Sequence, residues 1–81
     1  MIVETSKLNN TQFTLMPGKK PEANEVSKLI LRIKEKQKEP FAKIYLTLHP
    51  IYFMTVSYAL NQAGIKIKGM SPHNKLFVME I

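Results

Sequence analysis

The feature that most constrains the fold is a change of hydrophobic period around residue 18. From Thr11 to Met16, apolar and polar residues alternate with Phe13 and Leu15 on one side, and this alternation predicts a β-strand. Beyond Pro21, apolar residues recur every three or four positions, which predicts an amphipathic helix. Gly18 permits a sharp turn between the two, and proline suits the first position of a helix. A strand, a turn and a helix are therefore expected in immediate succession.

The same two periods continue toward the C-terminus. They predict a helix from Pro21 to about Lys38, a strand from Ala42 to His49, a second helix from Pro50 to about Ala63 and strands at Ile65 to Met70 and Lys75 to Ile81. Gly64 is expected just beyond the second helix, and Ser71 to Asn74 are expected to form the turn between the last strands. Residues 1–10 are interpreted as an N-terminal tail or a short extra strand, and residues 11–81 as a single domain.

The expected order from residue 11 is β-α-β-α-β-β. Parallel strand connections are right-handed, so both helices should cover the same face of a four-stranded mixed sheet. The fold class is therefore α/β, in the form of an α+β two-layer sandwich. The opposite sheet face is expected to be partly exposed and to be lined by Lys43, Tyr45, Thr47, His49, Lys66 and Lys68.

The charge of the chain favours an anionic partner. Lysine and arginine number 12 against 6 acidic residues, and the net charge is +6. All of these cations except Arg32 are lysines, whose mobile point charges suit phosphates better than the edges of particular bases. Lys19 and Lys20 stand beside the start of a predicted helix, where free N–H groups also attract anions. Sequence-tolerant binding to a nucleic-acid backbone is one reading, and a charge that serves solubility is the other.

Several classes of function find no support in the sequence. Cysteine is absent, and neither His49 nor His73 has another ligand at metal-binding spacing, so no metal site is expected. No nucleophile–base pair, paired carboxylates or long phosphate-binding glycine loop is found, so we expect neither an enzyme nor a cofactor. No signal peptide is visible, and the longest apolar stretch, Ile51 to Leu60, is too short to span a membrane. We expect a cytoplasmic protein, associated with the nucleoid if it binds DNA.

The second predicted helix is apolar nearly all the way round. A helix of this kind is buried on more than one side, and in so small a chain the second side should belong to another subunit. The sequence therefore predicts a homodimer, with an interface formed by Phe53, Met54, Tyr58 and Leu60.

The Gly18-Lys19-Lys20-Pro21 motif, followed by Asn24 and Val26, resembles the Alba family of small basic archaeal chromatin and RNA-binding proteins. Ile65 to Lys68 looks like the third strand of that family. The resemblance implies a homodimer whose lysine pair contacts DNA or RNA phosphates and whose hairpins reach toward a groove. The candidate nucleic-acid-binding residues are Lys19, Lys20, Asn24, Lys66, Lys68 and Lys75.

Two other readings stay open. The loop from His49 to Tyr52 lacks the arginines usual in the Alba family, so the same fold could serve as a protein-interaction module that has lost strong nucleic-acid binding. The β-α-β-α-β-β order also occurs in the C-terminal domain of a bacterial translation initiation factor, which makes a ribosome-associated RNA role an alternative.

Overall fold

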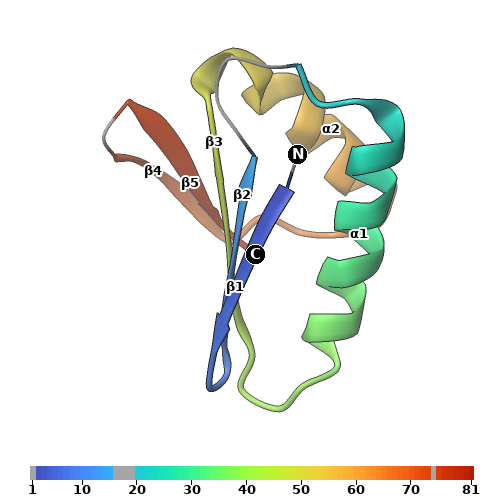
Figure 1. Ribbon diagram of the computed structural model, residues 1–81, viewed down its shortest axis with the longest axis vertical. Helices are drawn as coiled ribbons and strands as arrows, with labels where there is room; N and C mark the ends of the chain where they lie inside the picture. The colour runs from blue at the N-terminus through green and yellow to red at the C-terminus, as the bar shows by residue number, and fades with distance from the viewer. Residues whose placement is uncertain (1, 16–19, 74) are drawn as a thin grey trace.

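The chain folds into one mixed sheet and two helices. The computed structural model describes residues 2–15, 20–73 and 75–81. In chain order the elements are β1 (Ile2–Lys7), β2 (Asn10–Leu15), α1 (Ala23–Gln37), β3 (Lys43–Leu48), the short 3-10 helix η1 (Pro50–Tyr52), α2 (Phe53–Gln62), β4 (Gly69–His73) and β5 (Leu76–Glu80). The strand order is β1-β2-β3-β5-β4, and Figure 1 shows both helices on the same side of the sheet.

The sheet has five strands, so the expectation of four is wrong. The additional strand is β1, which pairs antiparallel with β2 from Ile2 opposite Leu15 to Lys7 opposite Asn10. Of the two readings of residues 1–10, the extra strand is therefore the correct one. Without β1, the backbone of β2 would lie at the edge of the sheet with unpaired groups, and pairing satisfies them.

The core lies between the sheet and the two helices, as the hydrophobic periods predict. Phe13 on β2, Ile33 on α1 and Leu46 on β3 are among its most deeply buried side chains. The parallel pairing of β2 with β3 requires a crossover, and α1 provides it. The helix turns its apolar stripe inward, whereas Leu31, which falls off that stripe, is 62% exposed.

The strand β4 is displaced from its predicted position, whereas β5 lies within the strand predicted at Lys75 to Ile81. Residues 65–68 form no strand, and β4 begins only at Gly69, so the strand predicted at Ile65 to Met70 is wrong. Ser71 to His73 lie in β4 rather than in the predicted turn, and Asn74 lies outside the described residues. Pro72 misled the prediction because proline usually ends a strand. It is accommodated here because β4 is an edge strand, where a missing N–H costs no ladder bond.

The second helix is buried on one side within a single chain. It is preceded by η1, where the Nδ1 of His49 accepts the N–H of Ile51 at 3.2 Å. The helix ends at Gln62 with Ala63 as its C-cap, and Gly64 follows with a φ of 81°, as the sequence predicts. Val56 and Leu60 are fully buried in the core. Within the described ranges, no helix has both the length and the apolar character needed to cross a membrane.

Candidate nucleic-acid interface

The lysine pair predicted to bind phosphate lies just before α1. Lys20 is exposed, and Lys19 and Gly18 lie outside the described residues. Glu22 caps the helix in extended conformation without a side-chain cap bond, and Glu25 adds a carboxylate in the first turn. These acidic residues weaken the attraction of the helix N-terminus for an anion. At this junction, the lysine ammonium group is therefore a better phosphate ligand than the helix itself.

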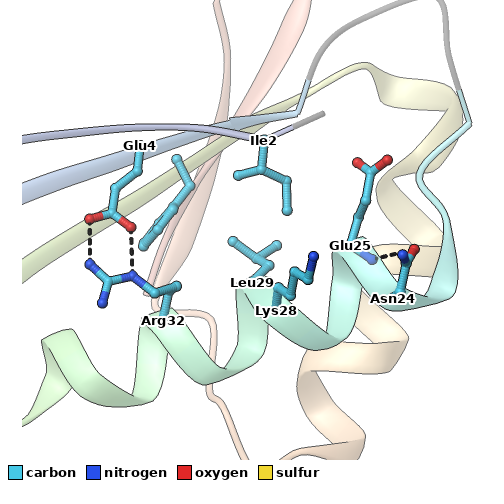
Figure 2. A pocket seen from close by; sticks show the side chains of 8 residues that line it. Ile2, Glu4, Asn24, Glu25, Lys28, Leu29 and Arg32 are labelled. Carbon is cyan, nitrogen blue, oxygen red and sulfur yellow. Dashed lines mark hydrogen bonds and ion pairs between the residues drawn. The ribbon is translucent and has the colours of Figure 1, made fainter.

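Asn24 serves the helix rather than an open basic surface. Its Oδ1 accepts the N–H of Glu25 at 2.9 Å. The side chain lies at the rim of a hollow of about 590 Å³ between β1 and α1 that Figure 2 shows from close by. The ionisable residues lining the hollow are Glu4, Glu25, Lys28 and Arg32, so opposite charges balance there. This balance disfavours the hollow as a phosphate site.

The only arginine of the chain is on the surface and is held by two carboxylates of the same chain. In Figure 2, Arg32 makes a two-pronged contact with Glu4, with Nε to Oε1 at 2.9 Å and Nη2 to Oε2 at 2.7 Å. Its third nitrogen, Nη1, contacts the carboxylate of Glu35. The hydrogen bond from Arg32 lowers the pKa of Glu4 below its ordinary value of 4.5, and the same bond raises the pKa of the guanidinium. Arg32 is therefore not placed to recognise the edges of particular bases.

The three hairpin lysines predicted to bind nucleic acid are all exposed but do not form one group. Lys66 and Lys68 lie in the irregular segment before β4, where the N–H of Lys68 donates to the carbonyl of Glu80 at 2.6 Å. Lys75 lies beyond His73, at the other end of the β4–β5 pairing. The register thus separates Lys75 from the other two by the length of the hairpin.

Lysines elsewhere on the described surface are also available to anions. Lys36 contacts Glu39 at 3.4 Å, and every other lysine of the described residues is exposed. Lys7 and Lys43 were not among the predicted binding residues, yet the strand register brings both beside Asn10. Lys7 was missed because residues 1–10 could not be assigned to a strand. The alternation along β3 did place Lys43 on the exposed sheet face with Tyr45, but it was not assigned to binding.

The predicted dimer residues separate into two groups. Leu60 is fully buried in the core of the single chain, and Phe53 is half-buried with its ring 5.4 Å from that of Phe77. Met54 and Tyr58 are 75% and 67% exposed, and Ile51 on η1 is 71% exposed. These three side chains, spaced three and four positions apart, form an apolar stripe that we call the outer α2 stripe.

The two histidines lie at the ends of β3 and β4. His49 accepts the Ile51 N–H described above and stands edge-on to the ring of Tyr52, and His73 ends β4. In the part of the chain that the structure describes, no group of three or more histidine, cysteine or acidic residues is arranged to hold a metal ion.

Comparison of the chain with protein-family models, with curated proteins and with solved structures finds no match.

Proposed function

We propose that this chain is a dimeric protein that binds DNA or RNA with little sequence preference, through contacts between lysines and phosphates. The proposal depends on one observation, namely which cationic side chains are bound to carboxylates of the same chain and which are exposed. The sole arginine is held by Glu4 and Glu35, whereas all described lysines other than Lys36 are exposed on a chain of net charge +6. Mobile lysine charges attract a phosphate backbone without reading bases.

The resemblance to the Alba family supports the same reading. The Gly18 to Pro21 motif precedes α1, and the strands after β1 follow the β-α-β-α-β-β order expected for that family. In this proposal Lys19 and Lys20 contact phosphates, while Lys66, Lys68 and Lys75 extend the basic surface along the hairpin. The outer α2 stripe joins two copies of the chain, because exposed apolar side chains grouped on one helix favour association.

The test is a fluorescence-anisotropy titration against random-sequence duplex DNA and structured RNA, from low to physiological salt. Binding should weaken steeply with salt because each phosphate contact releases a counterion. The K19A/K20A variant should bind all sequences more weakly and lower the log–log salt slope by about 2.

The matched control is K34A/K38A, which removes the same charge near the other end of α1. It should lower affinity less than K19A/K20A. If both variants weaken binding equally, the junction is not the site. If the wild-type chain does not bind even at low salt, the proposed function is wrong.

A protein-interaction module is the second candidate, and the outer α2 stripe is the observation that favours it. In that case the stripe holds a different protein rather than a second copy of this chain. A pull-down that returns one stoichiometric partner, from a chain that binds no nucleic acid, would support this function over the first.

A further inference from the structure

One face of the sheet carries a polar surface that no described element covers. Both helices pack on the other face (Figure 1), where Phe13, Leu46 and Met79 are buried. Side chains alternate between faces along each strand, so the neighbours of these residues in sequence lie on the uncovered face. The register aligns Thr5, Gln12, Tyr45 and Glu80 in one row across this face, and Lys7, Asn10 and Lys43 in the next row.

Tyr45 lies at the middle of this face. It is half-buried, and it lines two shallow hollows. The first, of about 310 Å³, lies over β1, β2 and β3; its other lining residues are Thr5, Lys7, Asn10, Thr11 and Gln12. The second, of about 240 Å³, lies over β4 and β5 and includes Glu80. An aromatic side chain bordered by open space is accessible to a flat ligand.

The charges of the two hollows are opposite. Lys7 lines the first, and Lys43 lies beside Asn10 in the same row, directly across β2 from Lys7. Glu80 lies next to Tyr45 in the second hollow. Of the two, the β1–β2–β3 side is therefore the one that attracts an anion, and the carboxylate marks the side from which a phosphate chain is repelled.

Two amide side chains complete the first hollow. Gln12 is held in place because its Nε2 donates to Thr47 Oγ1 at 3.2 Å. Asn10 lies between the two lysines. Amides both donate and accept hydrogen bonds, and they suit the edges of bases. These two adjacent rows therefore match the three parts of a nucleotide. The tyrosine ring suits the flat face of the base, the two amides suit its edge, and the two lysines suit the phosphates.

We propose that this hollow binds single-stranded RNA or DNA, with a base stacked on Tyr45, amide contacts from Asn10 and Gln12, and phosphates held by Lys7 and Lys43. The proposal rests on the proposed function and adds a substrate class to it. Bases in a duplex are stacked on one another, so only an unpaired base offers its flat face to a protein ring. Duplexes then engage the lysines before α1, while single strands use the open sheet face.

Phe41 precedes Lys43 in the chain but lines none of the hollows that Tyr45 lines. It is 88% exposed in the loop that leads into β3, and it lines a third hollow together with Lys66 and Lys68. Its φ is 58°, which is uncommon for a bulky residue. Glu39 and the core residues Ile44 and Ile81 also line this hollow, so its charge is mixed and it is a separate site from the one over Tyr45. Leu8 is similarly exposed, at 92%, in the adjacent β1–β2 turn, so a competing partner for this end of the molecule is an anionic membrane.

The experiment compares labelled single-stranded RNA and DNA oligonucleotides of mixed sequence with the corresponding duplexes, using the full chain. Tyr45→Ala should weaken single-strand binding about tenfold and leave duplex binding unchanged. Tyr45→Phe should bind single strands like the wild type, because the ring is retained. Leu31→Ala, which removes an exposed apolar side chain on α1, away from both the hollow and the outer α2 stripe, is the control and should have no such effect.

A second comparison, between K7A/K43A and K34A/K38A, uses only exposed residues, so neither variant should unfold the protein. Lys7 and Lys43 are exposed, so K7A/K43A should fold normally, and it should weaken single-strand binding more than K34A/K38A does. Equal single-strand binding by the wild type, Tyr45→Ala and K7A/K43A, with duplex binding intact, would overturn this inference alone. Loss of all nucleic-acid binding in the wild type would overturn the proposed function as well. Binding to phosphatidylserine vesicles that Phe41→Ser abolishes, without single-strand binding, would assign this end of the molecule to a membrane.

Discussion

Two apolar residues near the middle of α1 should contribute very differently to the free energy of unfolding, because one is buried and the other is exposed. Ile33 is fully buried between the helix and the sheet, whereas Leu31 is 62% exposed. Ile33→Ala should lower the free energy of unfolding by about 2–5 kcal/mol, because it removes buried methyl groups and leaves a cavity. Urea denaturation followed by circular dichroism measures this change.

Leu31→Ala is the control for Ile33→Ala on the same helix. It removes a similar side chain from an exposed position, and alanine has the higher helix propensity, so stability should change by no more than about 0.5 kcal/mol. Similar losses in the two variants would mean that α1 is not oriented as described.

At the scale of elements, β1 is an edge strand fastened to α1. Ile2 packs against the core from its first position, and Glu4 binds Arg32 across the hollow shown in Figure 2. The remaining residues of the strand are exposed and contribute little burial. Besides the backbone pairing with β2, the contact between Glu4 and Arg32 is therefore expected to slow the separation of β1 from the sheet.

This contact should make the opening of β1 depend on pH. The hydrogen bond from Arg32 lowers the folded-state pKa of Glu4 below 4.5. A lowered carboxyl pKa stabilises the fold above the unfolded-state pKa, and the effect is lost as pH falls through the folded-state value. Acidification below pH 4.5 should therefore speed opening of β1 relative to the rest of the sheet.

Hydrogen exchange of the β1 amides, corrected for the intrinsic effect of pH, measures this opening. Glu4→Gln should show fast opening at neutral pH and little further change in acid. Glu22→Gln removes an exposed carboxylate elsewhere and should behave like the wild type. A wild-type β1 that opens equally at neutral and acidic pH would show that the contact with Arg32 does not hold the strand.

At the scale of the whole molecule, the outer α2 stripe is expected to join two chains. The double variant Met54→Glu/Tyr58→Glu places charges on this exposed stripe. It should convert the proposed dimer to a monomer without altering the fold, because neither side chain belongs to the core. Sedimentation velocity over a range of concentrations measures the assembly, and circular dichroism checks the fold.

The matched control for the dimer is Leu31→Glu, which adds a charge to an exposed apolar position on the other helix. It should remain dimeric. A wild-type chain that sediments as a monomer at every concentration would exclude the stripe as a homodimer interface and favour the protein-interaction module.

Local pattern by itself determined the elements whose side chains alternate or repeat against a core. Phe13 with Leu15, Ile44 with Leu46, and Leu29 with Ile33 are buried as their periods predict, and Gly64 lies just beyond α2 with a positive φ. These elements can be predicted from the sequence because burying one face of a strand or helix requires apolar residues at a regular spacing. The charged candidates carry no such period. The sequence therefore predicted lysine contacts with phosphate, but it could not show that Lys7 and Lys43 lie in one row.

Tertiary structure alone decided the rest. β1 forms because β2 presents an unpaired edge, a condition absent from residues 2–7 themselves. Pro72 lies within β4 because that strand has a neighbour on one side only. The same is true of Lys7: its proximity to Lys43 and Tyr45, which alternation alone places together on β3, depends on the register of three strands. Pairing between distant segments is set by the whole sheet, so no local pattern records it.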